Sequence, residues 1–275
     1  MDLKTRLIFF GVILSSLVFL NTFWFFSHES LRGVENENNQ LTVVTIATGG
    51  YSPNLLIDSL YEDGQWRNAV VIADDCIENI VKPGYGRISR VPRPASVMET
   101  KTLKAKAFEH VSSQRVLFMD SDIVVKKPLK NFIQKIPKWK KGCDLYMQIY
   151  PLLPLLPRRF SFSTTLTPLV RKFDPAFWEW NSGIILMDRT HSAKLLEEWG
   201  KLIESGDFRM DQLALQHLLK SNKNFHLCAL PEECLFPASI AGKVGQRLSL
   251  SSPTFIHMTS YNKAKYKARC DNPQD

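Results

Sequence analysis

The 275-residue sequence lacks several features that would assign it to a common class of proteins. Its five cysteines form no Cys-x-x-Cys pair, which argues against a structural zinc site. It contains no internal repeat, and no pair of glutamates is positioned recognisably for a hydrolase with two acid/base carboxylates. The composition, 44% hydrophobic and 23% charged, is ordinary for a globular chain, so disorder is not expected for most of it.

One long segment near the start contains no charge at all. Residues 7–26 are uncharged and mainly apolar, and twenty such residues cross a bilayer as a helix. Two basic residues precede the segment, and three glutamates against one arginine follow it, which predicts that the C-terminal bulk lies outside the cytosol. We therefore expect a cytosolic tail at 1–6, a transmembrane signal anchor at 7–26, a polar stem at 27–40 and a lumenal domain at 41–275.

The alternative to an anchor is a cleaved signal peptide. The apolar core of a signal peptide is usually shorter, and no small-x-small cleavage site follows this one. The expected protein is thus a single-pass type II protein of the Golgi or endoplasmic reticulum membrane, because thinner bilayers match a span of this length. Disulfides can form in that oxidising lumen, and Cys228 with Cys234 is the closest candidate pair.

The net charge is +8, and most of it is expected to be solvated surface charge. Denser basic groups at residues 138–141 and 263–269 could meet anionic lipid, an anionic acceptor or a pyrophosphate. Nucleic acid is not expected as a partner, because the domain is predicted to be lumenal and anchored to a membrane.

From residue 41 onward, apolar runs bounded by turn residues alternate with helical patterns. The runs at 41–48, 69–73 and 115–119 predict buried strands, and the segments 53–62 and 100–111 predict helices between them. This order predicts an α/β domain with a mainly parallel central sheet that is covered on both faces.

The second half of the chain continues the pattern after an interruption. Residues 150–180 show no clean period and are expected to form a long loop region over the active site. Helices are expected at 192–204 and 210–220. Further strands are expected at 144–149, 183–187, 226–230 and 254–257.

The sharpest chemical feature is the triplet Asp120-Ser121-Asp122, which directly follows the apolar run at 115–119. Ligands of open α/β sheets bind at the carboxyl ends of the strands. Two carboxylates one residue apart at such an end can bind a divalent cation directly or through water. The structural alternative is a turn that carries two solvated aspartates.

The segment around this triplet, VLFMDSDIVV, resembles the donor site of glycosyltransferase family 8, the glycogenin-like and galactinol-synthase-like enzymes of GT-A fold. Further segments resemble that family's motifs in the same order: TIATGGY, TLKAKAF, WNSGIILMD, MDQLALQHLL and FIHMTSYNK. Together they cover nearly all of residues 41–263. The sequence departs from the family in having Ser121 for alanine and Ser260 for glycine, and in lacking Pro-Trp after Lys263.

The resemblance implies roles for individual residues of these motifs. A divalent cation would be bound by Asp120, Asp122 and His257. An imidazole beside two carboxylates favours Mn²⁺ over Mg²⁺ as that cation. The UDP-sugar donor would be contacted by Thr48, Tyr51, Lys104, Ser121, Ser182 and Lys263. The residues that act at the sugar would be Asn181, Asp211 and Gln212.

Each of these motifs also has a structural interpretation. Asn181 could cap a turn, Lys104 could lie on a helix surface, and His257 could be a core histidine. Asp211 could be a carboxylate at a helix N-terminus, where the macrodipole favours it. The pair at 74–75 follows the second predicted strand and could reach the nucleotide or cap a turn. The shared order of the motifs favours the site interpretation.

The expected function is a membrane-anchored, Mn-dependent glycosyltransferase that moves a sugar from UDP to an unknown glycan, protein or small-molecule acceptor. Family 8 enzymes retain the anomeric configuration, so the resemblance implies retention. It leaves Asp211 as the candidate to stabilise an oxocarbenium-like centre or to act as a transient nucleophile.

Two other functions remain as alternatives. A haloacid-dehalogenase-type phosphatase could use DSDIVV and GDFRMD, but GDFRMD follows an amphipathic helix instead of a buried strand, and about eighty residues of α/β pattern precede DSDIVV. The other alternative is an inactive sugar-binding protein of the same fold. The presence of every expected metal and phosphate ligand argues against that loss of activity.

Overall fold

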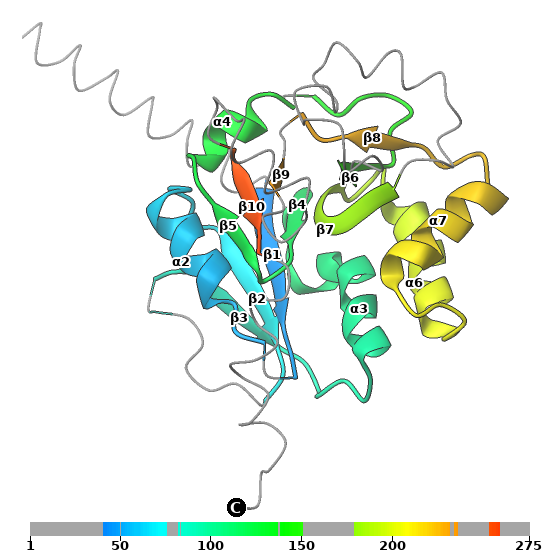
Figure 1. The fold of residues 1–275 in the computed structure, drawn as a ribbon, viewed down its shortest axis with the longest axis horizontal. Coiled ribbons are helices and arrows are strands. Elements are labelled where there is room, and N and C mark those ends of the chain that lie inside the picture. The colour runs from blue at the N-terminus through cyan, green and yellow to red at the C-terminus, as the bar shows by residue number, and fades with distance from the viewer. Residues whose placement is uncertain are drawn as a thin grey trace, which may run out of the picture. The chain divides into compact units, whose positions relative to one another are not determined.

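The central feature of the domain is a seven-stranded sheet in the order β3-β2-β1-β4-β7-β6-β8 (Figure 1). The computed structural model describes residues 41–49, 51–75, 82, 84–136, 138–150, 179–231, 234–235 and 253–258. The strands of the sheet are β1 at Leu41–Ala47, β2 at Ala69–Ala73, β3 at Arg87–Arg90, β4 at Arg115–Met119, β6 at Leu145–Tyr150, β7 at Glu179–Asp188 and β8 at Leu227–Ala229.

The sheet is mostly parallel, as the sequence predicts. β3, β2, β1 and β4 are parallel neighbours, and β6 and β8 form another parallel pair. β7 runs antiparallel to both of its neighbours, β4 and β6. The strands β1, β2 and β4 are almost entirely buried, which explains their uninterrupted apolar sequences, because both faces of a covered parallel sheet exclude water.

Helices cover both faces of this sheet (Figure 1). On the face of α2, residues such as Val43 and Leu117 form one core. On the opposite face, Val44 and Phe118 pack with α6 and α7 in a second core. Neighbouring residues of one strand thus serve different cores, as the alternation of side chains in a strand requires. The helices are α2 at Asn54–Glu62, α3 at Val97–Ala105, α4 at Leu129–Ile133, α6 at Ala193–Glu204 and α7 at Asp211–Ser221, with a 3-10 turn η1 at Ala107–His110.

The helix predicted at 100–111 is wrong at both ends, since α3 begins at residue 97 and ends at residue 105. Its start is set by Ser96, whose side chain accepts a hydrogen bond from the Glu99 backbone N–H. The chain after α3 tightens into η1 and does not continue as an α-helix. α3 therefore carries Lys101 and Lys104 one helical turn apart.

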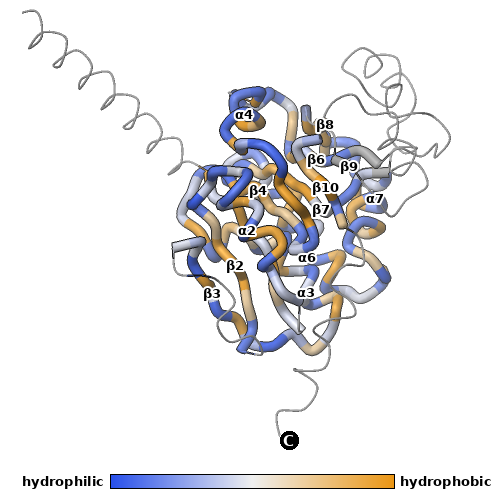
Figure 2. The backbone as a smooth tube through the Cα atoms, turned by 60° about the vertical axis from the view of Figure 1, so that its left-hand side comes forward, coloured by the Kyte–Doolittle hydropathy of each residue, from blue (hydrophilic) through white to orange (hydrophobic). Residues whose placement is uncertain are grey.

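A second, smaller sheet consists of β5 at Ile123–Val125, β10 at Phe255–His257 and β9 at Cys234–Leu235, in that order. Of these strands, only β10 is predicted from the sequence. β3 is also missed, because its sequence RISR is largely exposed and carries arginines at both ends. Figure 2 shows this contrast, with β2 in hydrophobic colours and β3 beside it mostly in hydrophilic ones.

The two ends of the segment 150–180, which is predicted as a loop, belong to strands. β6 continues through Tyr150, and β7 begins at Glu179 and runs for ten residues. Residues 151–178 lie outside the described part of the chain, and the loop predicted there is therefore not described.

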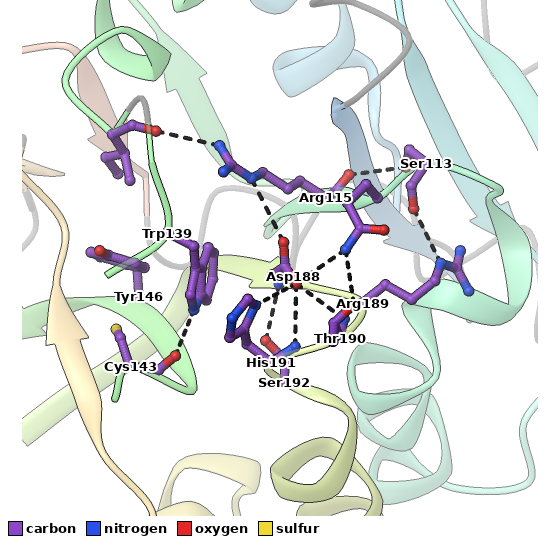
Figure 3. A network of polar contacts seen from close by, with 12 residues as sticks. Ser113, Arg115, Trp139, Cys143, Tyr146, Asp188, Arg189, Thr190, His191 and Ser192 are labelled. Carbon is purple, nitrogen blue, oxygen red and sulfur yellow. Dashed lines mark hydrogen bonds and ion pairs between the residues drawn. The ribbon is translucent and has the colours of Figure 1, made fainter. Parts of the chain in front are cut away.

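Asp188, at the end of β7, is the centre of a polar network beside the start of β4 (Figure 3). Its carboxylate accepts hydrogen bonds of 3.0 to 3.2 Å from the Gln114 side chain and from the backbone N–H groups of Thr190 and His191. Nδ1 of His191 lies 2.8 Å from the same carboxylate, and Nε of Arg115 lies 3.8 Å from it. Burial raises the pKa of the Asp188 carboxyl, but the bonds from His191 and its neighbours outweigh burial and hold the pKa below its usual value.

The structure pairs Cys143 with Cys228, so the sequence-based choice of Cys228 with Cys234 is wrong. The paired Cα atoms are 5.9 Å apart, within the range of a disulfide, although the two cysteines are separated by 85 residues in sequence. The pairing follows from the topology, because β6 and β8 are neighbours and Tyr146 lies opposite Cys228. Cys234 lies in β9, a strand of the second sheet.

No helix in the described ranges is long and apolar enough to span a membrane. The predicted cytosolic tail, anchor and stem, at 1–6, 7–26 and 27–40, all lie outside those ranges.

Candidate active site

Several predicted site residues lie at one edge of the large sheet. β1, β2 and β4 are parallel and in register, so their carboxyl ends meet at this edge. Thr48 follows β1, Asp74 follows β2 and Asp120 follows β4. The sheet therefore brings together three polar residues that are far apart in sequence, at the edge where α/β sheets bind ligands.

The two aspartates of the triplet lie in a tight turn between β4 and β5, Asp120 as its first residue and Asp122 as its third. The turn is closed by a hydrogen bond from the Ile123 N–H to the Asp120 carbonyl, at 3.1 Å. β5 then pairs antiparallel with β10, and this register sets His257 opposite Ile123. The Met258 N–H donates to the Asp122 carbonyl at 2.8 Å, which holds the end of β10 against the turn.

Asp120, Asp122 and His257 form a group that could hold a metal ion. Each offers one ligand atom, and these atoms lie within 4.8 Å of one another. Nε2 of His257 is 3.1 Å from Oδ1 of Asp122 and 3.9 Å from Oδ2 of Asp120. The imidazole is buried, while both carboxylates are partly exposed, so the group is open to a ligand on the carboxylate side. Two carboxylates and one imidazole are a donor set that suits Mn²⁺.

The Asn-Ser-Gly tripeptide of β7 lies close to the group of Asp120, Asp122 and His257 because β7 is irregular at this point. The register of β7 against β6 shifts between the pairs Met147–Ile185 and Gln148–Asn181, so residues 182–184 are extra on β7. Such a bulge redirects side chains and is common beside active sites. It brings the Gly183 carbonyl within 2.8 Å of the Asp120 N–H, which donates to it.

Gly183 has a steric reason to be glycine. A Cβ atom at this position would lie 2.6 Å from Cε1 of His257 and 2.8 Å from Oδ1 of Asn181. Its N–H donates to the same Asn181 Oδ1 at 2.9 Å. Asn181 therefore caps its own turn here, which is the structural interpretation considered for it, and Gly183 leaves room for the imidazole.

Lys104 lies buried between the metal group and Asp211. Its Nζ is 3.0 Å from Oδ1 of Asp120, 3.0 Å from Oδ2 of Asp211 and 3.2 Å from the carbonyl oxygen of Ser182. Burial lowers the pKa of Lys104, but the charges of Asp120 and Asp211 outweigh burial and raise the pKa well above its usual value. Lys104 is therefore a charged, internal residue of the site, and the helix-surface interpretation of it is wrong.

Asp211 begins α7 and is also buried. Oδ1 is 2.7 Å from Nζ of Lys101, and Oδ2 accepts a hydrogen bond from Ser182 Oγ at 2.8 Å in addition to its contact with Lys104. The backbone carbonyl of Asp211 accepts from Trp199 Nε1 at 2.8 Å, which holds α7 to α6. Burial raises the pKa of the Asp211 carboxyl, but Lys104 and Lys101 outweigh it and hold the pKa far below its usual value.

The residues at the ends of β1 and β2 hold one another in place. Oγ1 of Thr48 lies 3.0 Å from Oγ1 of Thr100, and Thr48 is buried. Oδ2 of Asp74 accepts a hydrogen bond from the Gly49 N–H at 2.8 Å. Gly49 has φ +61°, a conformation that glycine adopts at little cost. Asp74 thus caps this turn, whereas Tyr51 beyond it is 39% exposed.

The remaining predicted site residues are Ser121, Gln212 and Lys263. Ser121 is buried within the turn of the triplet, and Gln212 lies half-buried in the first turn of α7. Lys263 lies outside the described residues, so its predicted phosphate contact is not described.

The sequence predicts no role for Lys101 or Gly183. Lys101 is three residues before Lys104 on α3, and this spacing on a helix places both on one face. This spacing could have indicated from the sequence that Lys101 lies beside Lys104 in the site. The role of Gly183 had no signal of its own, because its neighbour His257 comes from a strand more than seventy residues later.

No family model matches this sequence, and no curated protein matches it. Among solved structures, the chain is similar to the galactosyltransferase LgtC in complex with donor and acceptor sugar analogs, with a TM-score of 0.52 and 14% identity over 78% of this chain and 86% of that one. It is similar at a TM-score of 0.51 and 12% identity, with the same coverage, to an active-site mutant of LgtC. The described domain therefore has the GT-A fold of these structures.

Proposed function

We propose that this chain is a metal-dependent glycosyltransferase that transfers a sugar from UDP to an acceptor with retention of configuration. The observation that carries the proposal is the group of Asp120, Asp122 and His257 at the carboxyl end of β4, in a domain of GT-A fold. LgtC, which shares the fold, was solved with donor and acceptor sugar analogs, and this supports a nucleotide-sugar donor and a sugar acceptor here.

In this proposal Asp120, Asp122 and His257 would hold Mn²⁺ at the site of the donor diphosphate. A divalent cation there would offset the negative charge that develops on the leaving UDP. The uracil and ribose would lie near Thr48 and the exposed Tyr51, whose ring would stack on the uracil. Lys263 adds a positive charge to the diphosphate.

Asp211 is assigned to sugar binding, together with Asn181, Ser182 and Gln212. Two ammonium groups lie within 3.0 Å of its carboxylate, so its negative charge is largely compensated. A compensated carboxylate is a weak nucleophile and offers little stabilisation to an oxocarbenium-like centre. The geometry thus favours a retaining reaction in which the leaving phosphate accepts the proton of the acceptor.

The proposed protein is a single-pass type II protein of the Golgi or endoplasmic reticulum membrane, with residues 7–26 as anchor and the domain in the lumen. Its support is the uncharged segment with basic residues before it. The Cys143–Cys228 pair agrees with a lumenal domain, because disulfides persist in oxidising compartments. Labelling of each terminus in permeabilised and sealed vesicles tests this orientation.

The activity is tested with the full chain in detergent micelles and a panel of UDP-sugars, with Mn²⁺ and with a chelator. We expect metal-dependent release of UDP from one donor, and loss of this release by about a hundredfold or more in Asp122→Asn. Asp207→Asn, a change at an exposed aspartate, is the matched control and should keep the activity. Metal-independent release, or no release and no donor binding by calorimetry, would contradict the proposal.

A further inference from the structure

The two lysines of α3 differ in how many of their N–H groups the protein uses. An ammonium group has three N–H donors. Lys104 directs its three at Asp120, Asp211 and the Ser182 carbonyl, and its side chain is only 9% exposed. It therefore has no donor left for a ligand unless one of these contacts breaks.

Lys101 uses fewer of its N–H groups for contacts within the described part of the protein. Within the described ranges its Nζ contacts one acceptor, Oδ1 of Asp211, at 2.7 Å. Its side chain is 23% exposed, compared with 3% for Asp211. The buried carboxylate thus anchors the ammonium at a fixed position and leaves other N–H groups of Lys101 accessible from outside.

The charge of Lys101 is already matched. Lys101 pairs with Asp211, and Lys104 pairs with Asp120, so each ammonium has a carboxylate at 3.0 Å or less. The two lysines and the two aspartates together carry no net charge, so a ligand carboxylate gains little net attraction from them, whereas a neutral hydroxyl oxygen can still accept a hydrogen bond from Lys101.

We propose that Lys101 is a specificity-determining residue that donates a hydrogen bond to a hydroxyl of the donor sugar, and that the donor is a neutral UDP-sugar and not a UDP-uronic acid. The inference rests on the proposed function, in which Asp211 and Ser182 hold the sugar. It adds Lys101 as a residue that recognises the donor sugar, and neutral sugars as the class that is recognised.

Calorimetry with Mn²⁺ and two matched donor pairs tests the class of sugar: UDP-glucose with UDP-glucuronate, and UDP-galactose with UDP-galacturonate. The members of each pair differ only in a hydroxymethyl group or a carboxylate. We expect the full chain to bind one neutral donor about tenfold or more tightly than its uronate counterpart. Tighter binding of a uronate that is lost in Lys101→Met would overturn the inference in favour of a carboxylate site.

A double-mutant cycle tests the hydroxyl contact. The preferred neutral donor is compared with analogues that each lack one sugar hydroxyl, in the natural chain and in Lys101→Met. One analogue should bind the natural chain about tenfold more weakly and bind Lys101→Met no more weakly than the parent donor does. Lys101→Arg should restore part of the difference, because it also donates N–H groups.

Lys106→Met is the matched control on the same helix, since Lys106 is exposed and pairs with Glu204. It should bind the donors like the natural chain. Equal weakening of all analogues by Lys101→Met, or no weakening at all, would overturn the inference while leaving the glycosyltransferase proposal intact. Failure of the natural chain to bind any donor would overturn both.

Discussion

The backbone of Gly183 lies so close to the ring of His257 that a side chain on residue 183 would place Cβ 2.6 Å from Cε1 of the imidazole. We therefore expect Gly183→Ala to move the imidazole away from Asp122 and to weaken Mn²⁺ binding by about 10- to 100-fold. The measurement is a calorimetric titration of the full chain with Mn²⁺, accompanied by thermal unfolding.

Gly200→Ala provides the matched control for this change. Gly200 lies in α6, and its Cβ would meet the Ala105 Cβ at 3.4 Å, an ordinary contact. It should leave Mn²⁺ binding unchanged. If Gly183→Ala bound Mn²⁺ as tightly as Gly200→Ala, the placement of His257 as a ligand would be wrong.

Thr45→Val should stabilise the domain. Thr45 is fully buried in β1, and its hydroxyl finds no hydrogen-bond partner in the part of the chain that the structure describes. Valine has nearly the same shape and removes the cost of burying that group, so the free energy of unfolding should rise by about 1 kcal/mol. Urea unfolding measures the change.

Thr42→Val, on the same strand, should act in the opposite direction. Thr42 is also buried, but its Oγ1 accepts a hydrogen bond from Asn68 Nδ2 at 3.1 Å. Losing this bond should lower the free energy of unfolding by about 1 kcal/mol. Equal effects of the two substitutions would show that the two hydroxyls do not differ in their bonding.

Asp188→Asn should lower stability near neutral pH and have less effect in acid. The folded-state pKa of Asp188 is depressed, so its contribution is complete above its unfolded-state pKa of about 3.9 and is lost as the pH falls through the folded-state value. The loss at pH 7 should be about 1–3 kcal/mol, since charged hydrogen bonds to His191 and its neighbours are weakened. Urea unfolding at pH 7 and at about pH 3 measures both values.

The exposed Asp207 supplies the control for this pH dependence. Asp207→Asn should change stability by less than about 0.5 kcal/mol at either pH. A loss for Asp188→Asn that stayed constant down to about pH 3 would point to packing and not to charge.

Cys143→Ser should destabilise the domain by about 2–5 kcal/mol, because the Cys143–Cys228 link closes a loop of 85 residues and restricts the unfolded chain. Cys228→Ser should have the same effect, and the double variant should be no worse than either single one. Peptide mapping without reductant should show the two segments joined. A joined pair containing Cys234 in place of Cys143 would contradict the structure.

The strands that carry the site were predictable because burial on both faces makes their sequences continuous and apolar. β2 and β4 occur at the predicted positions, 69–73 and 115–119, and the triplet follows β4 directly. The close approach of Asp120, Asp122 and His257 was expected from the family resemblance, and the structure brings these three together. The hydrophobic periodicity of a strand does not show which strands are its neighbours. The strand order and the antiparallel direction of β7 could therefore not be predicted from it.

What could not be predicted depends on contacts between distant segments or on short exposed strands. The Cys143–Cys228 pair requires β6 and β8 to be neighbours, and sequence distance favoured the wrong partner. β3 has an exposed, arginine-rich sequence without alternation. The start of α3 was detectable, because Ser96 and Glu99 are spaced as a capping box.

The pairing of β5 with β10 also bears on how the protein is made. Asp120 and Asp122 leave the ribosome long before His257, which lies in the last described strand. A nascent chain can thus form the strands of the large sheet while its metal group still lacks the imidazole. Synthesis that stops anywhere before residue 257 yields a domain that lacks one of the three residues of the proposed metal group, so this group is complete only after the last described strand has been translated.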